Sequence, residues 1–298
     1  MHTNRKFKKN RGQILLHITF ILISLCYILP IMITISASFS SEKSLSIGGG
    51  FSLFPKEFTL DAYRMIFAKP AQIIYSYITT ATFSLVGMAL SVIVMALMAY
   101  PLSRDNFKGK RFVNVYVLIT MLFSGGMVPS YILNSTYLHL DDTIWIYILP
   151  GLVGAYNVFV LKAGYKGIPN ELIEAAKVDG ADEFYVFARI MLPLSKATLA
   201  TVGFLVLIGK WNDWATSSIY IRNPKLYSLQ YLLQRILNEA QFLQSLANDG
   251  VLKDVDKYLP TESLRYAMML VAAGPMLVVF PFFQKYFVKG MTIGAVKG

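Results

Sequence analysis

Long apolar segments recur along this chain, and they restrict what it can fold into more than any other feature. The clearest segments cover residues 14–37, 73–101, 112–133, 144–162 and 263–287, and a further one begins near Ala197. About 20 apolar residues in a helix cross the hydrocarbon layer of a bilayer. The sequence therefore predicts an all-α membrane protein with six transmembrane helices.

Composition agrees with this class. Hydrophobic residues make up 55% of the 298 residues and charged residues only 15%, whereas a soluble domain carries about a quarter charged residues. The net charge of +11 would suggest nucleic acid in a soluble protein. Here the basic residues gather beside the apolar segments, at 1–12, 103–111, 162–196 and 285–298. By the positive-inside rule we expect these segments and both termini in the cytosol, membrane lipid around the spans, and no nucleic-acid partner.

The segment 169–193 is the one long polar and amphipathic stretch between apolar ones. Asn170 is a candidate N-cap for a first short helix, which Gly180 should end. Asp182 is a candidate cap for a second helix, which Pro193 should end. The acidic residues of the whole segment are Glu171, Glu174, Asp179, Asp182 and Glu183. The apolar face predicted for the second helix holds Phe184, Phe187, Ala188 and Met191.

This segment resembles a known motif. Glu174-Ala175-Ala176, Gly180, Ile190 and Leu192-Pro193 match, at the same spacing, the EAA loop of the permease subunits of ABC importers. The resemblance implies a type I importer permease fold with a cytosolic coupling helix pair between spans 4 and 5, which docks on an ATPase. The coupling residues expected from it are Glu171, Glu174, Ala175, Ala176, Asp179, Gly180, Phe184, Phe187, Ile190, Leu192 and Pro193. The alternative is an amphipathic hairpin that lies on the inner membrane surface.

Two further stretches are similar to the carbohydrate subgroup of these permeases, namely AYNVFVLKAG at 155–164 and YFVKGMTIGAVKG at 286–298. The resemblance implies import of an oligosaccharide by alternating access, across a bacterial plasma membrane. It also implies a homologous permease subunit as heterodimer partner, a cytosolic ATPase dimer and an extracellular solute-binding protein. The chain has no GxxxxGK[ST] phosphate loop, so ATP and Mg would be bound by a partner subunit. We expect no catalytic residue, no metal and no cofactor in this chain.

A polar and aromatic cluster near the end of the fifth apolar segment is a candidate substrate path. It contains Lys210, Trp211, Asn212, Asp213 and Trp214, and a weaker pair on the fourth segment is Tyr156 and Asn157. Ionisable groups at this depth usually face water or pair with one another, and Lys210 and Asp213 are three residues apart. The alternative, which the residues alone favour, is an interfacial aromatic belt with a snorkelling lysine.

Two other classes of function stay open from the residues alone. A gradient-driven secondary transporter or channel predicts an internal repeat or broken half-helices, and no convincing repeat is present. A membrane-embedded enzyme needs polar residues at one depth on several spans. For the importer, the expected division is a basic tail at 1–13, a first span with an outer loop at 14–72, a core permease domain at 73–290 and a cytosolic tail at 291–298.

Overall fold

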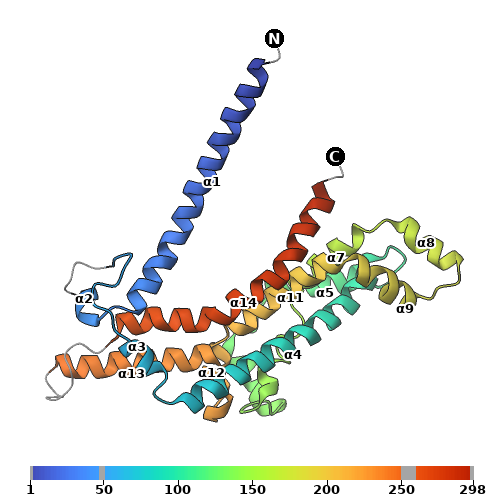
Figure 1. Cartoon of the computed structure of the whole chain (residues 1–298). Coiled ribbons are helices and arrows are strands. Elements are labelled where there is room, and N and C mark those ends of the chain that lie inside the picture. The colour runs from blue at the N-terminus through green and yellow to red at the C-terminus, as the bar shows by residue number, and fades with distance from the viewer. Residues whose placement is uncertain (1–2, 47–50, 250–259, 296–298) are drawn as a thin grey trace. The chain divides into compact units, whose positions relative to one another are not determined.

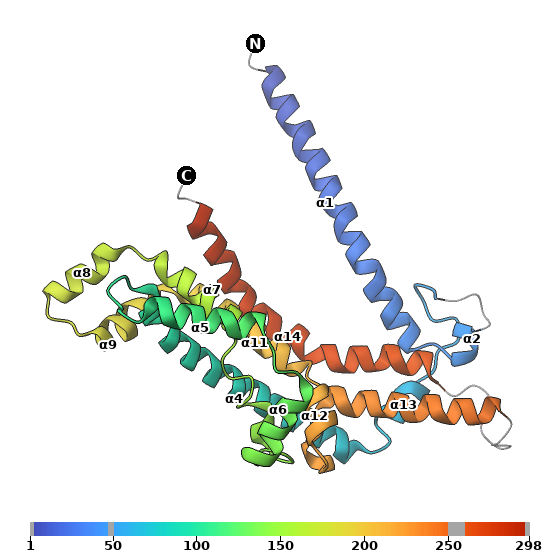
Figure 2. The same cartoon turned by 180° about the vertical axis from the view of Figure 1, so that it is seen from behind.

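The computed structural model describes residues 3–46, 51–249 and 260–295. Within these ranges the chain is helical and forms no β-strand, apart from one antiparallel bridge between Ser40 and Phe58. The chain divides into two compact units, shown with their helices in Figures 1 and 2. The first unit holds residues 1–69 and 233–274, and the second holds 70–232 and 275–298. The division predicted above (1–13, 14–72, 73–290 and 291–298) was based on membrane topology and not on compactness, so it stays a prediction.

The helices of the first unit are α1 (Thr3–Ser38), α2 (Glu42–Ser46), α3 (Asp61–Ile66), most of α13 (Leu229–Asn248) and the first part of α14 (Glu262–Ala295). The second unit holds α4 (Pro70–Ser103), α5 (Lys110–Leu122), α6 (Met127–Tyr131), η1 (Ile132–Tyr137), η2 (Ile144–Tyr147), α7 (Ala155–Lys166), α8 (Asn170–Val178), α9 (Glu183–Tyr185), η3 (Val186–Met191), α10 (Leu192–Leu194), α11 (Lys196–Trp211), α12 (Ala215–Tyr220) and η4 (Pro224–Leu226). The rest of α14 also belongs to it.

Three helical stretches of the described chain are long and apolar enough to cross a membrane: Gly12–Ser38, Pro70–Ser103 and Glu262–Tyr286. Two more candidates are bent pairs, Lys110–Leu122 with Met127–Tyr137 at 112°, and Glu183–Leu194 with Lys196–Trp211 at 78°. The predicted third span is thus broken, and its break contains Gly126 with a φ of 87°. Length and composition therefore support up to five spans within the described residues, and the predicted count of six stays a prediction.

The predicted fourth span, 144–162, is not one continuous helix. It begins as the short 3₁₀ helix η2, and the α-helix starts only at Ala155. Pro150, Gly151 and Gly154 lie between the two pieces, and both residue types disfavour a continuous helix. Between the fifth and sixth apolar segments the chain forms the 20-residue helix α13, which is too polar to resemble a span.

The core of the second unit lies where α4, α7 and α11 run side by side (Figure 1). Small residues allow a close approach: a Cβ added at Gly164 of α7 would lie 2.6 Å from Thr198 Oγ1 of α11. The buried side chains of this core are Met95, Ala96, Ala99, Tyr100, Leu102, Val158, Leu161, Tyr165, Ile173, Val186, Phe187, Met191 and Val202. Residues of the segment 169–193 thus belong to the same core as the apolar helices.

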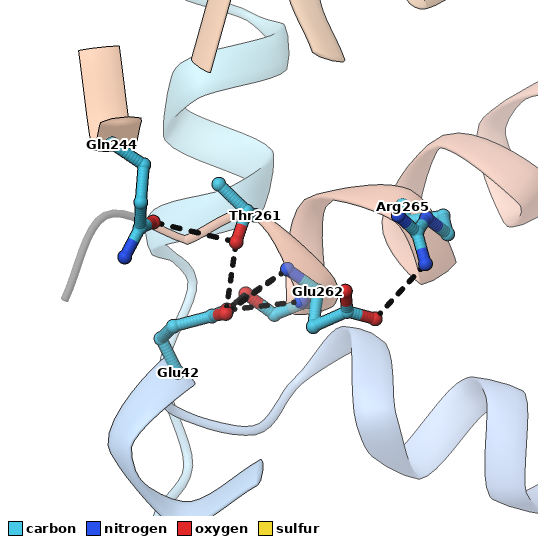
Figure 3. Close-up of polar contacts among 6 residues, drawn as sticks. Glu42, Gln244, Thr261, Glu262 and Arg265 are labelled. Carbon is cyan, nitrogen blue, oxygen red and sulfur yellow. Dashed lines mark hydrogen bonds and ion pairs between the residues drawn. The ribbon is translucent and has the colours of Figure 1, made fainter. Parts of the chain in front are cut away.

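In the first unit a buried glutamate caps the beginning of α14 (Figure 3). Glu42, on α2, accepts hydrogen bonds from the backbone N–H groups of Glu262 at 3.1 Å and Ser263 at 3.2 Å. The hydroxyls of Thr261 and Ser263 donate to it at 3.0 and 3.3 Å. The first N–H groups of a helix have no partner within the helix, and a carboxylate also suits the positive end of its dipole. Glu42 therefore links α2 to α14 although the two lie about 220 residues apart in sequence.

Replacing Glu42 with alanine should loosen this cap. We expect the local opening free energy of the first turn of α14 to fall by about 2 kcal/mol, because several donors lose their acceptor. Hydrogen exchange at the amides of Glu262 and Ser263 measures this change. Glu239→Ala is the matched control, since it removes an exposed ion pair with Arg235 that contributes little. Equal exchange in the two variants would contradict the capping role.

Candidate coupling loop and buried polar cluster

The first helix of the candidate loop, α8, is anchored by one buried side chain. Ile173 is 1% exposed and packs in the core beside α4, and Ala176 packs against it. Asn170 is the first helical residue and caps nothing, so its predicted role as N-cap is wrong. Pro169 occupies the cap position, and the Asn170 amide oxygen instead accepts a hydrogen bond from Arg104 at 3.2 Å.

Gly180 ends α8 as the sequence predicts. Its φ is 83°, in the left-handed region that side chains disfavour. The N–H of Gly180 donates to the carbonyl of Lys177 at 3.0 Å, and the N–H of Ala181 donates to that of Ala176 at 2.9 Å. This pair of bonds is the Schellman arrangement, which satisfies the last carbonyls of a helix and turns the chain.

The second helix begins at its predicted cap but continues further than expected. The Asp182 carboxylate accepts a hydrogen bond from the Tyr185 N–H at 2.6 Å. After one turn the helix widens into the π-helix η3, and it runs through Pro193 to Leu194. Pro193 was predicted to end it. The helix ends one residue after this proline, at Leu194, so the predicted end is close to the observed one.

The predicted apolar face of this second helix is only partly buried. Phe187 and Met191 are 7% and 0% exposed, whereas Phe184 is 71% exposed. Phe184 lies before the π-helix, whose extra residue per turn shifts the register of the face. Val186, which the periodicity did not select, is fully buried in its place. Of the other predicted coupling residues, Ile190 and Leu192 are half-buried and Pro193 is exposed.

Polar contacts hold the two helices of the loop to each other and to α4. The Tyr100 hydroxyl, from α4, donates to one carboxylate oxygen of Glu183, and Lys177 of α8 donates to the other. Nearby, Lys110 at the start of α5 pairs at 2.7 Å with Asp105, which lies in the turn between α4 and α5. The hydrogen bond from Lys110 lowers the pKa of the Asp105 carboxyl below its ordinary value. Figures 1 and 2 show α8 and α9 at this end of the second unit.

The outer side of the hairpin presents acidic and apolar side chains together. We call this the coupling surface; it comprises Glu171, Leu172, Glu174, Ala175, Val178, Asp179 and Phe184, all exposed. Val178 is 88% exposed and Leu172 47%. Glu171, Glu174 and Asp179 form no side-chain hydrogen bond or ion pair within the described chain. Apolar groups left on the outside of a loop, among unpaired acids, are typical of a surface that binds a partner.

Replacing Tyr100 with phenylalanine should release the second helix from α4. The loss of one hydrogen bond to a carboxylate is expected to lower its local opening free energy by about 1 kcal/mol. Hydrogen exchange over residues 183–189 should then accelerate about fivefold. Tyr185→Phe is the control, because that tyrosine is exposed and no side-chain bond of it is found in the described structure. Acceleration in both variants alike would show that the Glu183 contact does not hold the loop.

At the other end of the second unit, Lys210 lies buried among three segments. It is 9% exposed, and its Nζ donates to the Tyr147 carbonyl oxygen at 2.7 Å. Its aliphatic stem crosses Gly87 of α4, where an added Cβ would lie only 2.6 Å from Lys210 Cε. In the part of the chain that the structure describes, Lys210 and Asp213 form no ion pair, although their spacing allows one. Asp213 instead accepts a hydrogen bond from the Thr216 N–H at 3.0 Å.

Tyr147 connects this lysine to the loops around it. Its hydroxyl donates to the Leu226 carbonyl at 2.8 Å and lies 2.6 Å from Ser217 Oγ. Its ring stacks on Phe83 with centroids 4.2 Å apart. The N–H of Ser228 donates to Ser217 Oγ at 2.9 Å. Sequence reasoning selected Lys210 but missed Tyr147, Ser217 and Gly87, because no local pattern relates residues on separate segments.

The other residues predicted for the substrate path have separate surroundings. Trp211 is 4% exposed and lines an apolar groove of about 350 Å³ with Leu207 and Ser84, whereas Trp214 is 53% exposed. The Asn212 side chain accepts a hydrogen bond from Gln230 at 3.2 Å. On α7, Tyr156 is 59% exposed and Asn157 is half-buried. Their assignment to a substrate path stays a prediction.

Comparison with known proteins places these features in a family. Residues 74–293 match the family model described as "Binding-protein-dependent transport system inner membrane component". Protein LplC of Bacillus subtilis is 38% identical over 271 residues, which cover 91% of this chain and 90% of that protein. The polygalacturonan/rhamnogalacturonan transport system permease protein YtcP of the same organism is 34% identical and covers 97% of this chain and 100% of its own length.

A solved structure is similar over nearly the whole chain. It is a crystal structure of a bacterial ABC transporter involved in the import of the acidic polysaccharide alginate. The matched chain aligns with a TM-score of 0.74 and 26% sequence identity, and the match covers 96% of this chain and 98% of that one.

Proposed function

This chain belongs to the family of binding-protein-dependent transport system inner membrane components, and from that premise we propose that it is a transmembrane permease subunit of an ATP-driven importer for an oligosaccharide. The chain is a multi-pass membrane protein without an ATPase site of its own. A homologous permease subunit would complete the translocation path. A cytosolic ATPase dimer would bind ATP and Mg, and an extracellular solute-binding protein would deliver the sugar.

One observation carries the assignment of the coupling role to the loop. The coupling surface projects from a hairpin whose inner side is part of the core formed by α4, α7 and α11. Force on that surface would therefore reach the transmembrane helices through Ile173, Val186 and Phe187. ATP-driven closure of the ATPase dimer would move the hairpin with these helices as a rigid body, which is the basis of alternating access.

The substrate class is proposed from the relatives. One is named as a polygalacturonan/rhamnogalacturonan permease, and the solved relative imports alginate. Galacturonan and alginate are both acidic polysaccharides, which supports an oligosaccharide substrate that contains uronic acids. The exposed Trp214 and the polar Asn212 near the end of α11 remain the candidate sugar contacts, because indole faces stack on sugar rings and amides bind hydroxyls.

The orientation follows from the same proposal. The loop that docks on the ATPase must lie in the cytosol, which agrees with the basic segments at 1–12, 103–111 and 162–196 on that side. Both termini would then also be cytosolic. A cysteine introduced at position 2 should react with a membrane-impermeant maleimide only after the cells are permeabilised.

The experiment that tests the function is ATP hydrolysis by the purified assembly with its solute-binding protein. Glu174→Ala is expected to reduce sugar-stimulated hydrolysis several-fold, because an unpaired acid of the coupling surface is lost. Glu239→Ala, which removes an exposed acid of α13, is the matched control. If this chain purifies with no ATPase, and still transports sugar, the importer assignment is wrong and a gradient-driven carrier takes its place.

A further inference from the structure

A groove between α5 and α7 lies on the same end of the second unit as the coupling loop. Its volume is about 370 Å³, and it is lined by Asn114, Val115, Leu118, Phe159 and Lys162. Three of these residues are apolar or aromatic and two are polar. Phe159 and Lys162 lie within the stretch 155–164 that resembles the carbohydrate subgroup of the family, but the proposed transport function gives none of the five residues a role.

The polar end of this groove is fixed by hydrogen bonds. Lys162 Nζ donates to the Asn114 side-chain oxygen at 2.6 Å, and the Asn114 amide nitrogen donates to the Lys110 carbonyl at 2.6 Å. The ammonium group also lies 5.4 Å from the centroid of the Phe159 ring. The Lys162 ammonium group has three N–H donors, and Asn114 accepts a hydrogen bond from one of them. Two donors therefore stay available for a ligand.

More positive charge lies at the same end. Lys166 is exposed and four residues after Lys162, so the two side chains share one face of α7. Lys110 begins α5, one turn before Asn114, although Asp105 partly neutralises it. The charges that act on Lys162 are therefore those of Lys166 and Lys110, and Asp105 pairs with the second of these.

The apolar end points away from the lysines. Leu118 follows Lys110 by eight residues on α5, which is about 12 Å along a helix axis. Phe159 precedes Lys162 by almost one turn on α7. Because α5 begins and α7 ends beside these lysines, both helices lead from charged residues to apolar ones in the same direction. This order matches a phospholipid, whose charged headgroup lies at the membrane surface and whose chains run inward.

We propose that this groove binds an anionic phospholipid, with the headgroup phosphate on Lys162 and Lys166 and an acyl chain along Val115, Leu118 and Phe159. Basic pockets between transmembrane helices on the cytosolic side suit such headgroups. The inference rests on the proposed orientation, in which this end of the molecule faces the cytosol. The bound lipid would hold α5 against α7 next to the coupling loop.

The test uses the whole purified transporter in phosphatidylcholine nanodiscs. A trace of phosphatidylglycerol with a photoactivatable group midway along one chain is added, and crosslinked residues are mapped by mass spectrometry. We expect crosslinks at Val115, Leu118 or Phe159, and few from phosphatidylcholine with the same photoactivatable chain. Soluble glycerol phosphate should not reduce them, because it lacks the chain.

Substitutions test the headgroup contacts separately. Lys162→Gln and Lys166→Gln are each expected to reduce the phosphatidylglycerol crosslinks about fivefold. Lys196→Gln is the matched control, since it removes an exposed lysine at the same end of the unit, at the start of α11. ATP hydrolysis is measured on the same preparations, so that the proposed transport function is tested independently of lipid binding.

Three outcomes would overturn the inference. Equal crosslinking by the two lipids would remove the preference for an anion, and this comparison needs no variant. Undiminished crosslinking in both lysine variants would remove the assigned headgroup contacts. Contacts of the groove with a second permease subunit or with residues of α1, in place of lipid, would show that protein covers it.

Discussion

Replacing Gly180 with valine is expected to reduce sugar-stimulated ATP hydrolysis of the assembled transporter about tenfold. Gly180 has a φ of 83°, and no atom lies within 4 Å of the position that a Cβ would take. A larger side chain therefore meets no steric obstacle beyond its own backbone. A β-branched residue is strongly disfavoured at positive φ, so the strain of about 1–3 kcal/mol falls entirely on the turn between α8 and α9.

Relief of that strain would change the coupling surface. If residue 180 leaves the left-handed region, the two Schellman hydrogen bonds break and α8 no longer meets α9 at the same angle. Glu174 and Phe184, which lie on the two helices, would then no longer fit one partner surface. The spans and the buried core residues are not touched by the substitution, so the chain should still insert and co-purify with its partners.

Gly180→Asn is the matched control for this prediction. Asparagine tolerates the left-handed region far better than valine while also adding a side chain. We expect it to retain most of the stimulated hydrolysis. Loss of activity in both variants would mean that the partner contacts Gly180 itself, and full activity in the valine variant would show that the turn does not set the coupling geometry.

The second large effect is expected at Gly87, where α4 makes room for Lys210. In Gly87→Ala the new methyl group would lie 2.6 Å from Lys210 Cε and 2.7 Å from Cδ. The end of the lysine side chain must shift, and we expect this shift to break its 2.7 Å hydrogen bond to the Tyr147 carbonyl. A buried charged donor without its acceptor should cost about 2–3 kcal/mol of stability, measured as reduced thermal stability of the purified assembly.

A double-mutant cycle makes this prediction specific to the Gly87–Lys210 contact. In a Lys210→Ala background the obstacle is gone, so Gly87→Ala should be nearly neutral, with a coupling of about 2 kcal/mol between the two sites. Gly203→Ala is the control on α11, because its methyl group would meet Val92 and Met88 of α4 at ordinary distances of 3.6 and 3.7 Å. Additive effects of the two substitutions would show that the contact between Gly87 and Lys210 does not cause the loss of stability.

The same variants separate two roles for Lys210. If it links α4, η2 and α11, as its hydrogen bond and burial indicate, its loss should lower stability and leave the preference among sugars unchanged. If it binds an anionic sugar, its loss should weaken sugar-stimulated hydrolysis for acidic oligosaccharides more than for neutral ones, at little cost in stability. The structure favours the first role, because the side chain is already bonded to a backbone carbonyl.

Some features of this protein follow from local sequence alone. Apolar segments of about 20 residues with few charges identify a helical membrane protein. In the bilayer such a segment must satisfy its backbone N–H and C=O groups by hydrogen bonds within the segment, and a helix does this. The break at Gly180 and the cap at Asp182 were also predicted correctly. Both depend on one residue's backbone preference or on a side chain three residues from its partner, so neighbouring residues suffice to define them.

Other features depend on residues far apart in the sequence, and only the tertiary structure decided them. The partner of Lys210 is a carbonyl 63 residues away, not the nearby Asp213. Phe184 is exposed although helical periodicity placed it on the buried face, because the π-helix that follows shifts the register. Glu42 caps a helix that begins about 220 residues later. The partners of Lys210 and Glu42 lie on distant segments that no local spacing identifies, and the π-helix beside Phe184 has no simple sequence signal.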